Sequence, residues 1–230
     1  TNMPRLNFYR NEISRALLSP LTAGKVSRLI RPTIATVYLT SYCNSRCTMC
    51  DFWKGERDPK ELSSEQWGVV FSRLKAFGVD YVGVNASGEM FTRRDVFEIL
   101  GHLSRLGMNF GVNSNGTLFS AGNARKLAML RPRAVTIGLD GVGDASYLAT
   151  RGLEGGFKKV SRHIDTLQRE GIRNIGIGSV MMESNMADWV ALARFALDKG
   201  LGGVRFTAHH EAYFKGAQEA APAAFADPQK

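Results

Sequence analysis

Short runs of β-branched and apolar residues alternate along this chain with longer segments of helical periodicity, the pattern of βα units around a parallel sheet. We expect strands at 33–39, 79–84, 108–113, 134–139, 172–180 and 203–208. We expect helices at 63–78, 93–107, 121–130, 155–171 and 185–200. Right-handed crossovers between sequential parallel strands produce an open doubly wound sheet or a curved barrel. Because a closed barrel needs eight repeats, the sequence indicates an α/β fold that forms at most a partial barrel.

Capping residues set the expected helix boundaries. Ser63 or Ser64 is expected to cap the N-terminus of the first helix, and Gly78 is expected to end it. Asn185 is expected to begin the last helix and Gly200 to end it.

The chain is expected to form one domain with an appendage at each end. Residues 1–32 would be a basic N-terminal extension, residues 33–208 the barrel, and residues 209–230 an Ala-, Pro- and Gln-rich tail. The formal net charge is +9, and Glu12 is the only acidic residue of the extension. Such a charge favours an anionic substrate, a nucleic acid or a membrane surface. A solvated basic surface would explain the charge without any partner.

Composition and cysteine usage indicate where the protein works. No apolar run approaches the ~20 residues that a membrane span needs, and the first residues lack the pattern of a secretory signal. Three cysteines crowded into eight residues make a poor disulfide framework and suit a reducing compartment. We therefore expect a cytoplasmic protein with no membrane span.

Polar and glycine-rich segments follow every predicted strand. They are SYCNSRCTMC at 41–50, NASGE at 85–89, NSNGT at 113–117, LDGVGD at 139–144, MMESN at 181–185 and HHEAY at 209–213. In both candidate architectures the loops at the carboxyl ends of parallel strands form the active face. The functional residues are therefore expected to gather at this face.

All three cysteines of the chain, Cys43, Cys47 and Cys50, lie in the first of these segments with the spacing C-x3-C-x2-C. Thiolates with this spacing on an irregular loop can bind three corners of an iron–sulfur cube and leave the fourth iron open to another ligand. A structural zinc site needs four ligands in two pairs, and the histidines lie at least fifty residues away. Three ordinary buried thiols are the alternative interpretation.

With this motif after its first strand, the chain resembles the radical SAM superfamily, and the resemblance covers residues 33–208. It implies a partial (β/α)6 TIM-like barrel that binds a 4Fe-4S cluster at Cys43, Cys47 and Cys50. In that family S-adenosylmethionine (SAM) chelates the open iron, and an electron from the cluster cleaves it to methionine and a 5′-deoxyadenosyl radical. That radical takes a hydrogen atom from the substrate.

A second match is Ser87-Gly88-Glu89-Met90, followed by FTRRD, which resembles the GGEP-type loop of the family. There small residues let the backbone approach the methionine end of SAM, and the resemblance implies that Glu89 serves its ammonium group. Ser87 replaces the usual glycine and Met90 the usual proline. Serine is still small enough for a close approach.

Three further segments imply SAM contacts. Asn113 and Ser114 begin a segment similar to the TNG segment of the family and would contact the ribose or the carboxylate, although N-G is also a turn signal. The segment from Ile137 to Gly141 resembles the SLDG segment of the family, with Gly138 in the place of the serine. Arg151 would pair with the SAM carboxylate; the alternative is an exposed arginine near a helix start. Val180 would lie against the adenine.

The resemblance extends to Phe52, two residues beyond the last cysteine, and to the partners. Phe52 would bring backbone polar groups to the adenine amino edge. An electron donor such as a flavodoxin or ferredoxin is implied. No residue is assigned to chemistry on the substrate, but polar side chains after the sixth strand could hold it. These are His209, His210, Glu211 and Tyr213.

The leading hypothesis is a radical SAM enzyme that abstracts a hydrogen from a small metabolite or a peptide. An RNA-modifying radical SAM enzyme is the second hypothesis, favoured by the net charge of +9. The third is a non-catalytic zinc or iron–sulfur module. If the 230 residues are the whole protein, we expect one cluster only.

Overall fold

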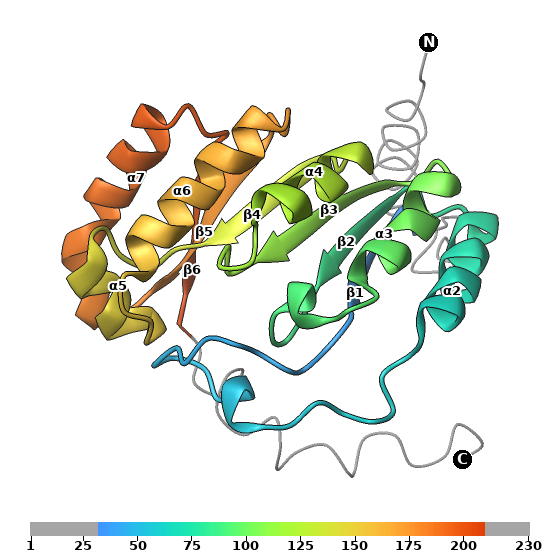
Figure 1. The fold of residues 1–230 in the computed structure, drawn as a ribbon, viewed down its shortest axis with the longest axis horizontal. Coiled ribbons are helices and arrows are strands. Elements are labelled where there is room, and N and C mark those ends of the chain that lie inside the picture. Colours follow the sequence, from blue (N-terminus) through green and yellow to red (C-terminus); the bar gives the residue numbers. More distant parts are fainter. Residues whose placement is uncertain (1–31, 210–230) are drawn as a thin grey trace, which may run out of the picture.

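The computed structural model describes residues 32–209, which form a single sheet of six parallel strands in the order of the sequence. The strands are β1 (Ile34–Tyr38), β2 (Tyr81–Asn85), β3 (Asn109–Ser114), β4 (Ala134–Gly138), β5 (Ile175–Met181) and β6 (Val204–Ala208). All six predicted strands are confirmed. The sheet curls into a half-barrel, as the resemblance implied (Figure 1). The predicted extension, most of the tail, and His210, Glu211 and Tyr213 lie outside the described residues.

The described helices cover one face of this sheet (Figure 1). They are α2 (Ser64–Phe77), α3 (Val96–Arg105), α4 (Ala121–Met129), α5 (Asp144–Arg151), α6 (Gly156–Arg169) and α7 (Trp189–Asp198). Short 3-10 turns are η2 (Phe52–Lys54), η3 (Met90–Thr92) and η4 (Glu183–Asp188). No helix of the described part is long and apolar enough to cross a membrane.

Helix α5 was not predicted, because it is short and lacks a sequence signal at its start. Its N-cap is Gly143, which has no side chain that could accept a hydrogen bond, so the sequence resembles a loop. The helix is stabilised by packing: Tyr147 is fully buried, and its ring lies so close to the backbone of Gly156 that a Cβ there would be 2.3 Å away. Tertiary contact, rather than helix propensity, forms α5.

The last helix begins later than predicted. Asn185 lies inside η4 and not at the N-cap of α7. Its side-chain amide donates to the carbonyl oxygens of Asp140 and Val180 at 2.9 and 2.8 Å, and its oxygen accepts from the backbone of Met182 at 2.9 Å. The asparagine therefore joins the end of β5 to the loop after β4.

The two faces of the sheet differ in composition. The face under the helices is apolar and buried; it consists of Val82, Val84, Phe110, Val112, Val135, Ile137, Ile175 and Ile177. The opposite, concave face combines glycines and polar residues with three larger side chains, those of Ile34, Tyr38 and Tyr81. It carries Thr36, Gly83, Asn85, Gly111, Asn113, Thr136, Gly138, Gly176 and Gly178. The core therefore lies outside the barrel wall, and the concave face is left with room for a ligand.

The start of α2 offers a test of the local fold. The Ser63 hydroxyl accepts a hydrogen bond from the Gln66 N–H, and the Gln66 side-chain oxygen accepts one from the Ser63 N–H, which is a capping box. We expect Ser63→Ala to lower the free energy of unfolding by about 1 kcal/mol. Ser72→Ala in the same helix removes only a bond to the Gly68 carbonyl and should change it by less than about 0.5 kcal/mol. Urea unfolding measures both free energies, and equal losses in the two variants would contradict a stabilising capping box at Ser63.

Candidate functional site

The segment that carries the three cysteines has neither helix nor strand between β1 and η2. Figure 1 shows it, in blue, leaving β1, crossing the carboxyl ends of the strands toward α5 and returning to η2. Backbone hydrogen bonds hold it at two places. Glu89 N–H donates to the Tyr42 carbonyl at 2.8 Å, and Thr48 N–H donates to the Thr150 carbonyl at 3.0 Å. The conformation of this segment therefore depends on groups from other elements.

Two glycines allow the other elements to approach this segment closely. A Cβ at Gly88 would lie 2.0 Å from the carbonyl oxygen of Tyr42 and 2.7 Å from that of Ser41. A Cβ at Gly152 would lie 2.4 Å from the carbonyl oxygen of Arg46, and Gly152 also has a φ of +66°. A side chain fits at neither position without moving backbone. Ser87, beside Gly88, is partly exposed.

Glu89 is buried and joins the loops after β2 and β3. Its carboxylate accepts from the Phe91 N–H at 3.1 Å, the Ser114 hydroxyl at 3.0 Å and the Asn115 N–H at 2.6 Å. Burial raises the pKa of Glu89, and these donors partly offset that rise. Glu89 and Ser114, both predicted to contact SAM, are therefore hydrogen-bonded to each other.

Asn115 is a site residue to which the sequence analysis gave no role. Its amide donates to the side-chain oxygens of Asn44 and Ser45 at 2.8 and 2.9 Å, and Asn44 in turn donates to Thr117 at 2.9 Å. These bonds fix the start of the cysteine segment to the loop after β3. The motif NSNGT pointed to this loop. The prediction chose its first asparagine, Asn113, whereas its second, Asn115, contacts the cysteine segment.

Arg151 is not an exposed arginine near a helix start, which was the alternative interpretation. It ends α5, and its guanidinium lies over Gly138, where a Cβ would be 2.7 Å from the nearest nitrogen. Its Nε is 2.5 Å from the Asp140 carboxylate. Burial raises the pKa of Cys47, and the adjacent positive charge of Arg151 opposes that rise. Arg151 thus faces both a carboxylate and a cysteine of the motif.

Arg93 and Glu61 hold the entrance and the exit of the cysteine segment together. Arg93 is buried and donates to the Leu39 carbonyl at 2.8 Å and to both carboxylate oxygens of Asp95, at 2.9 and 2.7 Å. Glu61 accepts from Arg93 at 3.3 Å and from the Thr40 hydroxyl. The sequence analysis noted FTRRD, which contains Arg93, but did not predict that Arg93 would bind both ends of the cysteine segment.

The other predicted contact residues lie around the same end of the sheet. Asn113 donates from its side chain to Asn85 on the concave face. Val180 N–H donates to the Asp140 carboxylate at 2.7 Å, and its side chain is partly exposed. Phe52 begins η2 and is partly exposed. The structure therefore brings every predicted contact residue to the carboxyl ends of the strands or to the turn after the cysteines.

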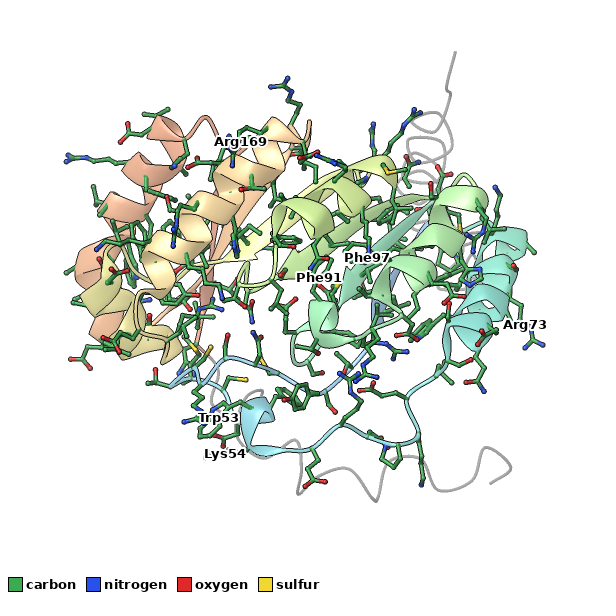
Figure 2. All side chains as sticks on the ribbon, in the orientation of Figure 1. Trp53, Lys54, Arg73, Phe91, Phe97 and Arg169 are labelled. Carbon is green, nitrogen blue, oxygen red and sulfur yellow. The ribbon has the colours of Figure 1, made fainter. Side chains whose placement is uncertain are left out.

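A cation–π pair orients η2 relative to the cysteine segment. The ring centroid of Trp53 lies 5.9 Å from the guanidinium carbon of Arg46 and 5.6 Å from the ammonium of Lys54. Figure 2 shows Trp53 and Lys54 together on the outer side of this turn.

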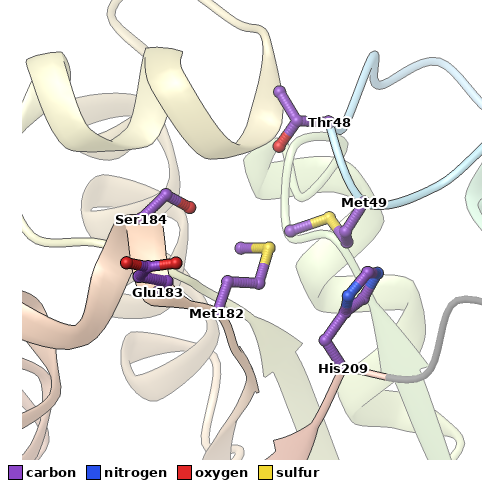
Figure 3. Close-up of a pocket in the computed structure, with 6 residues that line it drawn as sticks. All are labelled: Thr48, Met49, Met182, Glu183, Ser184 and His209. Atoms are coloured by element: carbon purple, nitrogen blue, oxygen red, sulfur yellow. The ribbon is translucent and has the colours of Figure 1, made fainter.

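A pocket of about 440 Å³ lies between the cysteine segment and the ends of β5 and β6. Six residues line it: Thr48, Met49, Met182, Glu183, Ser184 and His209. Their labelled side chains surround one space in Figure 3. Of the residues predicted to hold a substrate, His209 is the one that the structure describes, and it lies at this pocket. The pocket combines thioethers with hydroxyls, a carboxylate and an imidazole.

Comparison with known protein families decides the membership of this chain. The family described as the radical SAM superfamily matches residues 37–196, which is more than half of the 230 residues. The chain belongs to the radical SAM superfamily. Members of this superfamily use a 4Fe-4S cluster and SAM, and both were expected from the cysteine spacing and the resemblance.

Two curated relatives are named as maturation enzymes. The sporulation killing factor maturation protein SkfB of Bacillus subtilis (strain 168) is 34% identical over 154 residues, which cover 67% of this chain and 37% of SkfB. The mycofactocin maturase MftC of Mycolicibacterium smegmatis (strain ATCC 700084 / mc(2)155) is 30% identical over 155 residues, covering 67% of this chain and 39% of MftC. The chain matches less than half the length of either relative.

A solved structure shares the fold. SuiB of Streptococcus suis, in complex with the precursor peptide SuiA, superimposes with a TM-score of 0.71 at 15% identity. The match covers 89% of this chain and 55% of SuiB. The predicted partial barrel is therefore confirmed, while the SAM contacts of individual residues stay predictions.

The three thiols of this radical SAM chain are the donors that an iron–sulfur cubane takes at its separate corners. Cys43, Cys47 and Cys50 are unpaired, and burial raises the pKa of Cys43 to about 11. A positively charged group such as iron would compensate these buried thiolates.

The close approach at Gly88 predicts a loss of cluster binding in a conservative variant. We expect Gly88→Ala to reduce the iron and sulfide bound after anaerobic reconstitution by more than half, because the new methyl group displaces the backbone at Tyr42. Gly122→Ala is the matched control, since a Cβ at that helical position contacts nothing within 4 Å. Equal iron content in both variants would contradict the assignment.

The buried ion pair predicts a large stability effect. We expect Asp140→Ala to lower the free energy of unfolding of the apoprotein by about 3–5 kcal/mol, because Arg151 is left buried without its partner. Asp165→Ala, which breaks a partly exposed pair with Lys199, should cost less than about 1 kcal/mol. Urea unfolding compares the two; a loss below about 1 kcal/mol in both variants would show that Arg151 finds another partner.

Proposed function

We propose that the chain is the core of a radical SAM enzyme that modifies a peptide. The observation that carries this proposal is the arrangement of the motif loops. The loops after β2 and β3 and the end of α5 all hydrogen-bond or pack against the cysteine segment. They hold it at the face where SAM would bind. The relatives named as maturation enzymes, and the precursor peptide in the SuiB complex, favour a peptide over a small metabolite.

Cys43, Cys47 and Cys50 would bind the cluster. When bound, the cluster would supply the electron that cleaves SAM, and the adenosyl radical would take a hydrogen atom from the peptide. Arg151 would offer its guanidinium to the SAM carboxylate from beside Cys47. Glu89, with two oxygens that already accept three bonds, would offer a remaining lone pair to the SAM ammonium.

Other residues would complete the SAM site and exclude water. Asn113 and Ser114 would serve the ribose or carboxylate, while Ser87 and Gly88 would let the backbone approach. Phe52 and Val180 would contact the adenine. The electron donor, a flavodoxin or ferredoxin, and the alternative of an RNA substrate stay predictions, as does a cytoplasmic location.

The decisive test is SAM cleavage. After anaerobic reconstitution and reduction with dithionite, we expect the wild-type chain to form 5′-deoxyadenosine from SAM, as measured by chromatography. Cys47→Ala should reduce the rate at least about a hundredfold, because the cluster loses one of three ligands. Ser72→Ala, on the outer face of α2, should retain the wild-type rate. A wild-type protein that takes up zinc and no cluster would refute the proposal.

A further inference from the structure

The described strands place a single charged side chain on the concave face of the half-barrel. Among the residues of the six described strands, Arg205 on β6 is the only one with a charged side chain. It pairs in register with Gly178 on β5, which pairs with Gly138 on β4. Because register partners in a parallel sheet project to the same face, Arg205 shares the face of these two glycines.

The neighbouring residues confirm the direction of the Arg205 side chain. A Cβ at Gly178 would lie 3.3 Å from the Thr136 side chain, which lies on the concave face. Phe206, the next residue of β6, projects to the opposite face and its ring lies 6.2 Å from that of Trp189 on α7. Since side chains alternate along a strand, Arg205 projects into the half-barrel.

Arg205 is available for a ligand. It is exposed, and it makes no hydrogen bond or ion pair with any residue between 32 and 209. Gly178 and Gly176 place no side chain beside it. The other arginine on this face, Arg151, lies over Gly138, about 10 Å away by strand spacing, and is paired with Asp140. Between residues 32 and 209, the positive charge of Arg151 is therefore paired with a carboxylate, and that of Arg205 is not.

The position of Arg205 relates it to the pocket at the cysteine segment. His209, which lines that pocket, is four residues further along the same strand direction, or about 13 Å. An extended peptide spans about 3.3–3.6 Å per residue. A peptide that runs along β6 from the pocket would thus reach Arg205 within about four residues.

We propose that Arg205 binds a carboxylate of the substrate peptide inside the half-barrel, within about four residues of the peptide segment that occupies the pocket. The identification of the ligand as a peptide rests on the proposed function. The planar guanidinium matches a carboxylate with two parallel hydrogen bonds. The side-chain amides of Asn85 and Asn113 lie on the same face and suit the backbone of a peptide.

The test measures binding and does not require turnover. The probes are fluorescein-labelled decapeptide pools, randomised except for a fixed central residue, added to the reconstituted full chain with SAM. One pool has a central Asp and an amidated C-terminus, the second a central Asn and an amidated C-terminus, and the third a central Asn and a free C-terminus. Fluorescence anisotropy gives the dissociation constants. The comparison of pools distinguishes a side-chain carboxylate from a terminal one.

We expect the wild-type chain to bind at least one carboxylate pool about tenfold more tightly than the amidated Asn pool, which corresponds to about 1.4 kcal/mol. Arg205→Gln should abolish this preference, and Arg205→Lys should restore part of it. Arg194→Gln, which removes the same charge from the exposed face of α7, should preserve it. A preference that survives Arg205→Gln, or the lack of one in the wild type, would overturn the proposal.

Two further results separate this proposal from the proposed function. Formation of 5′-deoxyadenosine in the absence of peptide should be equal in Arg205→Gln and wild type, because the proposed SAM site does not include Arg205. A wild type that forms none, yet shows the Arg205-dependent preference, would refute the radical chemistry alone. Arg205-dependent binding of a labelled ten-nucleotide RNA more tightly than any peptide pool would overturn the assignment of a peptide carboxylate.

Discussion

The whole site depends on holding an irregular segment with three thiols in one conformation. Such a segment has no internal ladder of hydrogen bonds, so its backbone and side chains need partners elsewhere. Here the partners come from the loops after β2 and β3 and from the end of α5, which are far apart in the sequence. Glu89 binds the Tyr42 carbonyl, Asn115 binds the Asn44 and Ser45 side chains, and Thr150 accepts from Thr48. The half-barrel matters because it brings these loops to one edge.

Electrostatics divides the concave face into two parts. The cysteine segment lies beside Arg151, whose charge is balanced by the buried Asp140 and opposes the rise in the pKa of Cys47 that burial causes. Across the face, Arg205 has no such partner within the described residues. Glycines between the two leave the sheet surface open. Arg151 is thus tied to Asp140 and to the thiols, whereas Arg205 stands apart from the cysteine segment.

Much of the fold could be predicted because its signals are local. Alternation of apolar runs indicated all six strands, and Ser63 and Gly78 end α2 as expected. Failures occurred where tertiary contact overrides local preference. Helix α5 has a glycine at its N-cap and forms because Tyr147 is buried, and Asn185 binds the loop after β4 instead of capping α7.

By itself the sequence determined the six strands, the cysteine motif and the edge at which the functional loops meet, since strand periodicity and motif spacing are properties of neighbouring residues. The partial barrel followed from the family resemblance, because periodicity alone also allowed an open sheet. Only the tertiary structure decided what each polar side chain does. It assigned the Arg93 and Glu61 contacts, paired Arg151 with Asp140 and placed Arg205 on the concave face. Hydrogen bonds and ion pairs between residues distant in the sequence have geometries that no local pattern encodes, because they exist only once the strands have closed into register.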